Sequence, residues 1–413
     1  MGSDGQLTSR FKAFWLILFL LTAAFSLSYL WFTLYPGKVD PLALQIFSDE
    51  QIQKGKVYSV VPRLTYILSF LVQATCLGWL IISGKIHGLT REAIRISRGR
   101  EWVSILLMFI GIWLLLKILS FPFSFFSNYI WQHQWGFSRQ SLSSWLLDDL
   151  KNSFLDIGIT GLGVLFLFGI FNHWPRMWWA VGTAFFAGWL VIQSFLWPIL
   201  IAPLFNNFSK VENPQIISMV EDLAKTADLK VNQILVMDAS RRTTKANAYY
   251  TGVGGTQRIV LYDTLLHDYD QNEIQAVIAH EMAHWKYGHI LKGVLLGILG
   301  SFLFWRIAFW TMNILFPKGK YPLEAWPVFL FLLLLFGFLS SPLQNYVSRQ
   351  METQADIMAV QLTEDPQSTI RLQIDLARRN LSDVSPSPFI EWFSYTHPPA
   401  LTRIKTIQEL SQK

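Results

Sequence analysis

Apolar residues in this chain gather into seven stretches, each near the length of about 20 residues that a helix needs to cross a bilayer. Tryptophans lie near many of the ends of these stretches, as in the aromatic belts of membrane interfaces. The first stretch is too long for the apolar part of a signal peptide and is expected to be a retained span. The predicted spans are 11–34, 64–84, 102–126, 152–171, 177–201, 290–316 and 327–345.

Between the fifth and sixth spans the pattern changes to that of a small folded insertion. A glycine-rich turn between two β-type runs predicts a hairpin, and the capping-box spacing of Asp270 and Glu273 predicts a helix start. The predicted elements are a helix over 214–229, an extended run over 233–238, hairpin arms over 246–251 and 258–262, and a helix from Asp270. The chain is thus divided into spans one to five (1–202), a folded insertion (203–289), spans six and seven (290–345) and a C-terminal helical segment (346–413).

The composition supports a membrane protein. Hydrophobic residues make up 52% of the chain and charged residues 15%, against roughly 25% charged residues in soluble proteins. We therefore predict an all-α membrane protein with a small α+β insertion. The net charge of +6 comes from clusters beside the spans, which suits anionic lipid headgroups and not nucleic acid. Cys76 is the single cysteine, which excludes an intrachain disulfide and a cysteine-rich metal site.

The predicted helix after Asp270 carries the sequence His280-Glu281-Met282-Ala283-His284. Residues four apart share a helix face, so both imidazoles can reach one metal ion. Glu281 lies between them, where its carboxylate can accept a proton from a metal-bound water. This pattern indicates a zinc metalloprotease, and a zinc ion needs a third protein ligand.

Two residues compete for the place of the third ligand. His289 follows the second histidine by five residues, whereas a metzincin needs six, so we expect it to end the polar part of the helix or to meet the headgroups. Glu352 follows span seven, and the histidine pair precedes span six. A short loop joins these two spans into an antiparallel hairpin, whose free ends emerge on one side of the membrane. We therefore assign Glu352 as the third ligand. Asp356, one turn further, can accept an N–H from a ligand histidine.

With these residues assigned, the chain resembles the integral-membrane type I CAAX prenyl protease family, whose members are seven-span zinc metalloproteases. The resemblance covers most of the chain and not only the metal motif. The matching segments are Pro122–Ser124, Gly136-Phe137, Pro198–Phe205, Asn247–Gly252, Arg258–Leu265, His280–Trp285, Glu352–Asp356, Thr396–Pro398 and Arg403-Ile404. The segment 317–326 is shorter than in eukaryotic members, which favours a bacterial relative.

The resemblance implies a gluzincin site with one Zn²⁺ per chain, held by His280, His284 and Glu352. Glu281 is then the general base and acid. The resemblance also implies that the seven helices form a barrel around a large hydrated chamber. The expected partners are the bilayer and a peptide or protein substrate, prenylated in the CAAX type, and we expect a monomer that binds no nucleic acid.

The resemblance gives four more residues a role in the site. His397 matches a histidine that stabilises the oxyanion of the reaction, and Arg403 matches an arginine that supports it. The strand around Asn247 and Ala248 matches an edge that pairs with an extended substrate. A hydrogen-bond donor stabilises charge where it develops, and strand addition uses main-chain hydrogen bonds that depend little on sequence. The alternative for His397 is an ordinary loop histidine held in place by the prolines that follow it. The alternative for Asn247 is a polar residue beside a turn.

The family resemblance and the distribution of basic residues predict opposite orientations in the membrane. The resemblance places the insertion and the C-terminus in the cytoplasm, in a bacterial inner membrane or in the endoplasmic reticulum. The N-terminal side carries ten basic residues and the short loops of the catalytic side carry six, which favours the reverse orientation by the positive-inside rule. We prefer the resemblance, because a basic cluster can also bind lipid.

Three rival functions stay open at this point. The first is a general quality-control protease of membrane proteins without dependence on a prenyl group. The second is a transporter, for which Lys117, Asp156 and Arg306 would be the intramembrane charges. The third is a membrane chaperone with a purely structural zinc ion, which would need four protein ligands where the sequence offers three and a base.

Overall fold

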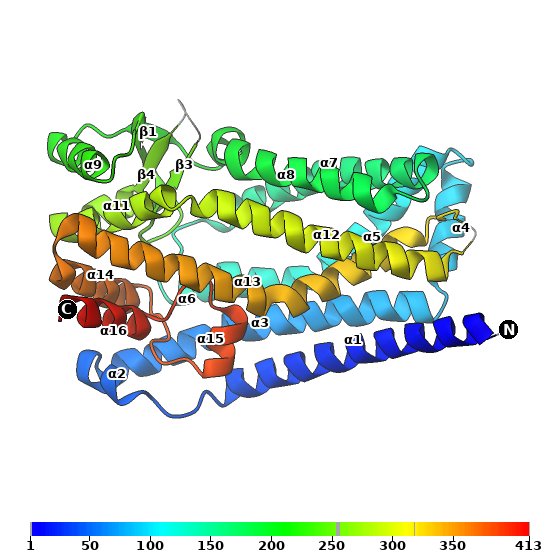
Figure 1. Ribbon diagram of the computed structural model, residues 1–413, viewed down its shortest axis with the longest axis horizontal. Helices are drawn as coiled ribbons and strands as arrows, with labels where there is room; N and C mark the ends of the chain where they lie inside the picture. The colour runs from blue at the N-terminus through cyan, green and yellow to red at the C-terminus, as the bar shows by residue number, and fades with distance from the viewer. Residues whose placement is uncertain (1, 253–256, 318, 413) are drawn as a thin grey trace.

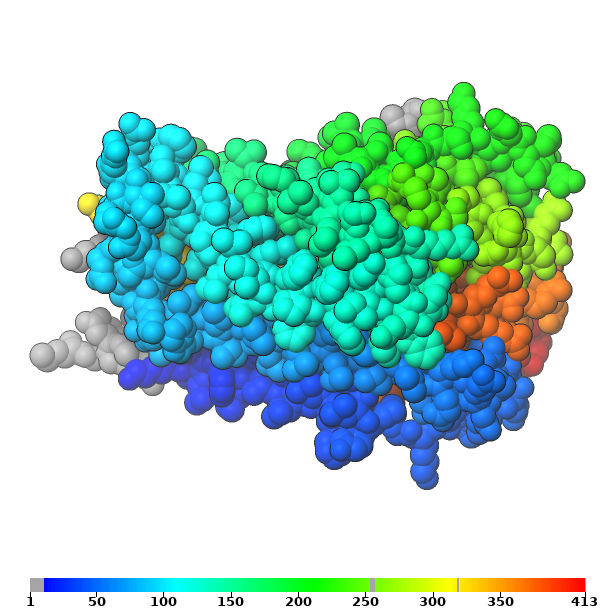
Figure 2. Space-filling model, turned by 180° about the vertical axis from the view of Figure 1, so that it is seen from behind, coloured from blue at the N-terminus to red at the C-terminus, as the bar shows by residue number. Residues whose placement is uncertain are grey.

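The computed structural model of the chain describes residues 2–252, 257–317 and 319–412. Long helices run side by side along the molecule, and a small sheet with several short helices lies at one end (Figure 1). The C-terminus lies at this same end. From behind, the helices coloured cyan to teal cover the middle of the molecule (Figure 2). The predicted fold class, helical spans with a small α+β insertion, is confirmed.

Within the described residues, seven helices are long and apolar enough to cross a membrane, which confirms the seven predicted spans. Several exceed the roughly 20 residues that a bilayer core needs, so their ends extend beyond it. The seventh, α13, continues for 39 residues, so Glu352 lies on the same helix as the span. The spans are α1 (Gly2–Leu34), α3 (Asp49–Ile82), α5 (Glu101–Phe125) continued through a π-helical turn (Phe126–Ile130) into α6 (Trp131–Gln134), α7 (Leu142–His173), α8 (Trp178–Leu200), α12 (His289–Leu315) and α13 (Ala325–Thr363).

Shorter helices build the ends of the molecule. In the insertion, the backbone N–H of Glu273 donates to the side chain of Asp270 at 2.9 Å. The backbone N–H of Asp270 donates in turn to the side chain of Glu273 at 3.0 Å. This capping box starts α11 where the sequence predicts a helix. The shorter helices are α2 (Pro41–Ile46), α4 (Ile86–Ile96), α9 (Pro214–Thr226), α10 (Asp263–Asp268), α11 (Gln271–Lys286), α14 (Pro366–Arg379), α15 (Pro388–Ser394), α16 (Ala400–Ser411) and two 3₁₀ turns (Ala202–Leu204 and Ala239–Arg241).

Four strands form the sheet of the insertion, in the order β1-β2-β4-β3. Strand β4 (Arg258–Tyr262) is parallel to β2 (Gln233–Met237) and antiparallel to β3 (Ala248–Thr251), and β1 (Phe208–Lys210) is antiparallel to β2. The predicted hairpin is therefore present, with a first arm that begins two residues later; most of its turn, 253–256, lies outside the described residues. Because β3 is at the edge, one row of its backbone groups faces away from the described sheet.

The insertion and the last span share one hydrophobic core. Ala279 and Met282 of α11, Ile259 and Leu261 of β4, and Ala359 of α13 are at most 1% exposed and belong to one buried cluster. Small alanine side chains let helix backbones approach closely. Packing of apolar residues thus holds α11 against both the sheet and the extension of α13.

A buried ion pair fastens the C-terminal segment to α3. Nη2 of Arg63 donates to Oδ2 of Asp383 at 2.9 Å and to Oη of Tyr395 at 2.8 Å, and the two charged side chains are 8% and 1% exposed. Nearby, a Cβ atom on Gly55 would lie 2.5 Å from the carbonyl oxygen of Ser382. Any larger residue would push the two backbones apart, so the glycine and the ion pair together fix this contact.

The three charged side chains that the sequence predicts in or near the spans each have a local partner. They are Lys117, bonded to Asp149 at 2.7 Å, Asp156, bonded to Nε1 of Trp113 at 2.6 Å, and Arg306, whose guanidinium lies 4.5 Å from the ring centre of Trp179. Separate local pairs do not form the connected row of ionisable groups that an ion or proton path uses. This arrangement gives no support to a transporter.

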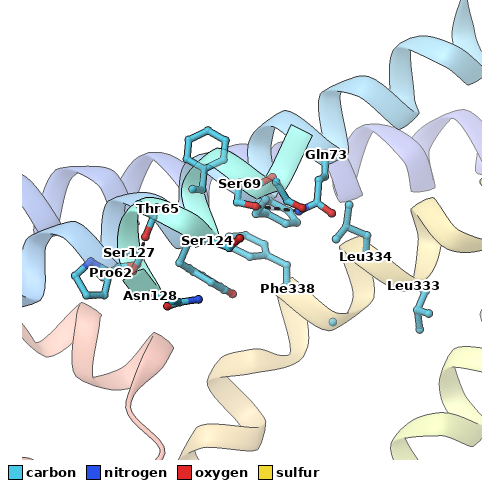
Figure 3. A pocket seen from close by; sticks show the side chains of 15 residues that line it. Pro62, Thr65, Ser69, Gln73, Ser124, Ser127, Asn128, Leu333, Leu334 and Phe338 are labelled. Carbon is cyan, nitrogen blue, oxygen red and sulfur yellow. Dashed lines mark hydrogen bonds between the residues drawn. The ribbon is translucent and has the colours of Figure 1, made fainter. Parts of the chain in front are cut away.

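A cavity of about 600 Å³ lies between α3, α5 with its π-helical turn, and α13 (Figure 3). Hydroxyl and amide side chains from α3 and α5 face apolar side chains from α13 across it. The described residues that line the cavity carry no formal charge. Those labelled in Figure 3 are Pro62, Thr65, Ser69, Gln73, Ser124, Ser127, Asn128, Leu333, Leu334 and Phe338.

Removal of one partner of the buried ion pair should destabilise the protein. In Asp383→Ala the Arg63 guanidinium loses its carboxylate while it stays buried, which costs about 3–5 kcal/mol. Thermal unfolding of the detergent-solubilised protein measures the effect. The control is Glu50→Ala, which breaks an exposed pair with Lys54 and should change little. Equal unfolding temperatures for both variants would contradict this account.

Candidate metal centre and active site

Three donor atoms from α11 and α13 converge on one point. Nε2 of His280 lies 3.1 Å from Nε2 of His284 and 3.2 Å from Oε2 of Glu352. Nε2 of His284 lies 3.3 Å from Oε1 of Glu352. Tetrahedral ligands at about 2.0–2.1 Å from a zinc ion stand about 3.3 Å from one another. The three side chains therefore have the chemistry and the spacing of three corners of a metal site, with the fourth corner free of protein ligands among the described residues.

A carboxylate and a guanidinium lie behind His280. Nδ1 of His280 is 3.0 Å from Oδ1 of Asp356, and Arg403 donates to Asp356 through Nε at 2.7 Å and Nη2 at 2.5 Å. A carboxylate that accepts the Nδ1–H leaves the Nε2 lone pair directed at the metal. Arg403 is thus bound to Asp356, on the Nδ1 side of the His280 ring.

The protonation of His280 is set by its carboxylate neighbours. Burial lowers the pKa of His280, but hydrogen bonds to Asp356 and Glu352 outweigh it and raise the pKa to about 9. The pKa rises because each ring nitrogen of His280 has a carboxylate to which it can donate, so the doubly protonated imidazolium is favoured. A metal ion that binds Nε2 has to displace this proton.

His284 is oriented by a second histidine, which sequence reasoning did not assign to the site. Nδ1 of His289 lies 2.9 Å from Nδ1 of His284, and Nε2 of His289 lies 3.2 Å from Oε1 of Gln354. The amide oxygen only accepts, so the Nε2 of His289 carries the hydrogen. Nδ1 of His289 then accepts from Nδ1–H of His284, whose Nε2 lone pair is left for the metal.

The position of His289 follows from a turn between α11 and α12. Gly288 has φ 63°, a left-handed conformation that glycine adopts without strain. The chain turns there, and His289 begins α12 with only 5% of its surface exposed. The expectation that His289 meets the headgroup layer is therefore wrong. In the sequence, the only sign of this contact is that His289 follows His284 by five residues. That spacing indicates a contact between the two rings only when the turn at Gly288 is known.

Glu281 lies beside the donors and against the sheet. Burial raises the pKa of Glu281, while His280 and His284 and a hydrogen bond from the backbone N–H of Tyr250 lower it in part. The ring of Tyr250 stacks on Trp285 at 4.2 Å, which holds β3 against α11. A carboxylate with a raised pKa accepts protons more readily near neutral pH.

His397 lies on the exposed side of the donor triangle. Its Nε2 is 3.4 Å from Oε1 of Glu352, and its side chain is 61% exposed. Nδ1 is 2.9 Å from Oγ1 of Thr396. The histidine belongs to the loop between α15 and α16, so an imidazole from the C-terminal segment lies beside the ligand Glu352.

The outward backbone groups of the edge strand β3 are partly occupied by side chains. Tyr262 donates its N–H to the carbonyl oxygen of Asn247 at 3.0 Å, so the alternate residues Ala248 and Tyr250 turn their backbone groups outward. The N–H of Ala248 is bonded to Oδ1 of its neighbour Asn247 at 2.9 Å, and that of Tyr250 to Glu281. The outward carbonyl of Ala248 has no hydrogen-bond donor among the described residues and can accept one from an added strand.

Comparisons with known proteins identify the family of the chain. The model of peptidase family M48 matches residues 210–411, and the model described as CAAX prenyl protease N-terminal, five membrane helices, matches residues 40–207. CAAX prenyl protease 1 of Saccharomyces cerevisiae is 30% identical over 72% of this chain and 70% of its own length. The chain belongs to peptidase family M48, among the CAAX prenyl proteases.

Other members of the M48 family cover the chain in the same way. A CAAX prenyl protease 1 homolog of Arabidopsis thaliana is 28% identical over 89% of this chain and 90% of its own length. An uncharacterised metalloprotease of Bacillus subtilis is 30% identical over 66% of each chain. The crystal structure of Ste24p from S. mikatae has the same fold, with a TM-score of 0.82 at 24% identity over 94% of this chain and 98% of the other. This member of the family is an integral membrane metalloprotease, and the family implies a bound metal ion.

Loss of His289 should weaken metal binding in this M48 peptidase. In His289→Ala the Nδ1–H of His284 loses its acceptor, so the ring is no longer fixed, and the metal affinity should fall about 10- to 100-fold. Competition with a chelator, followed by metal analysis, measures the affinity. The control is His267→Ala, which removes an exposed histidine paired with Asp268. An unchanged affinity in His289→Ala would remove this residue from the site.

Proposed function

We propose that the chain is a zinc-dependent endopeptidase that cleaves CAAX-type prenylated peptides near their C-terminus, on the cytoplasmic side of the membrane. The observation that carries the proposal is the donor triangle of His280, His284 and Glu352, which has no fourth protein ligand among the described residues. Glu281 lies between the two histidines on α11. Two imidazoles and one carboxylate form the ligand set of catalytic zinc sites that keep an open position. A structural zinc ion would use a fourth protein ligand.

The chemistry is divided between the metal and the side chains around it. A zinc ion held by the three donors would lower the pKa of a bound water to about 7 and polarise the scissile carbonyl. Glu281 accepts the proton of the attacking water and returns it to the leaving amine. Its raised pKa suits the first step, because it makes the carboxylate a better proton acceptor than an ordinary glutamate.

His397 and Arg403 are assigned different parts. His397 donates an N–H to the oxygen of the tetrahedral carbon, where negative charge develops; its exposed position and the 3.4 Å contact with Glu352 support this part. Arg403 acts through Asp356 and His280, so it is a positioning residue. Bidentate bonds from a guanidinium fix a carboxylate in direction as well as in place.

The edge of β3 is assigned to the substrate backbone. An extended peptide beside β3 adds a strand to the sheet, so that the carbonyl of Ala248 receives a backbone N–H from it. Asn247 keeps its own side chain on the N–H of Ala248 and thereby holds the edge in shape. The uncharged cavity between α3, α5 and α13 is assigned to the lipid substituent, because apolar chains prefer such surroundings to water.

Replacement of Glu281 should separate metal binding from catalysis. Glu281→Ala keeps the three ligands, so the zinc content should equal that of the wild type, while the cleavage rate should fall about 10²- to 10⁴-fold. Metal analysis and a peptide cleavage assay on the same preparation check both parts. Glu212→Ala, at an exposed position of the insertion, is the matched control. Cleavage that persists in Glu281→Ala would refute the mechanism even with zinc present.

A prenyl group should improve the substrate. A farnesylated CAAX peptide and the same peptide without the lipid differ only in an apolar chain, and each buried CH₂ contributes about 0.8 kcal/mol. We therefore expect kcat/KM to be at least about tenfold higher for the farnesylated peptide, measured in one detergent at fixed concentration. Equal values for the two peptides would favour a general quality-control protease.

A further inference from the structure

Lys245 is a partly buried cation without an acidic partner among the described residues. It lies on the segment that leads into β3, where Nζ is 4.6 Å from the ring centre of Phe137 and 5.2 Å from that of Tyr58. By contrast, the nearby Arg242 pairs with Asp148 at 2.9 Å. A cation kept over aromatic rings at a partly desolvated place attracts an anion more strongly than an exposed one.

The side chain of Lys245 is held in place by its neighbours. Oη of Tyr58 donates to Oε1 of Gln132 at 2.8 Å, so this oxygen accepts from Nζ of Lys245 at 2.9 Å. The backbone carbonyl of Lys245 accepts from Oγ1 of Thr264 at 2.9 Å. An ammonium group has three N–H donors, and one of them is used here, so the group is prepositioned with donors to spare.

The place of Lys245 along the strand edge matches the length of a leaving peptide. Lys245 precedes Ala248 by three residues, which is about 10 Å of extended chain. Antiparallel pairing is the commoner and slightly more stable way to add a strand, so residues after the cleaved bond run toward the start of β3. A CAAX substrate ends three residues after its prenylated cysteine, which is also about 10 Å.

From these observations we propose that Lys245 binds the free α-carboxylate of the substrate and so selects peptides that end three residues after the cleaved bond. The inference rests on the proposed function and gives it a recognition site for the C-terminus. Strand pairing and the lipid cavity do not distinguish a chain end from a chain that continues. A fixed cation at this distance does, because only a terminal carboxylate brings a negative charge there whatever the side chains.

The test compares two farnesylated peptides that differ only in a C-terminal carboxylate or carboxamide. In the wild type the carboxylate should be preferred about 10- to 100-fold in kcat/KM, as for a hydrogen bond to a charged group, and mainly through KM. In Lys245→Gln the preference should fall to near one. In Lys245→Arg, which keeps the charge, most of it should return.

A matched control variant and two measurements of structural integrity accompany this test. Lys225→Gln, on the exposed side of α9, should keep the full preference, and metal content and thermal unfolding should be the same in all the variants. A wild type that cleaves both peptides equally, or a Lys245→Gln variant that keeps the preference, would overturn the proposal. Failure of the wild type to cleave either peptide would instead refute the proposed function, and this inference with it.

Discussion

The close packing of α11 against the extension of α13 is the contact on which the site depends. It brings three lone-pair donors to within 3.1–3.3 Å of one another. Lone pairs this close repel one another unless a proton or a metal cation lies between them. The burial of apolar side chains offsets this repulsion, because the cluster that contains Ala279, Met282 and Ala359 holds the two helices together. The energy of core packing is thus stored as a preformed metal site, and metal binding and folding stabilise each other.

Each ligand of the triangle is then oriented by a partner from another part of the chain. Asp356, fixed by Arg403 from α16, takes the outer N–H of His280, and His289 takes that of His284. A helix alone would bring the imidazoles to one face but would leave each ring free to rotate. Distant segments remove this freedom, which is why the C-terminal segment, though far in sequence, is part of the site.

The sequence predicts those features that depend on a periodic pattern or on chain connectivity. Seven apolar stretches predict the spans, and the antiparallel hairpin of α12 and α13 predicts that Glu352 returns to the histidines. The environment of His289 depends on the left-handed turn at Gly288, which no periodicity reveals. Tyr58 and Phe137, the aromatic neighbours of the Lys245 ammonium group, come from segments more than 100 residues away, and only the packed fold brings them together.

The continuity of α13 links the two ends of the proposed substrate. Phe338, at the cavity, and Glu352, at the metal donors, lie on one helix, 14 residues and therefore about 21 Å apart along its axis. The helix sets this separation, so a lipid in the cavity and a peptide bond at the donors must be joined by a chain of suitable length. Lys117, Asp156 and Arg306, by contrast, each have a local partner, whereas the metal donors and Glu281 lie together where α11 meets α13.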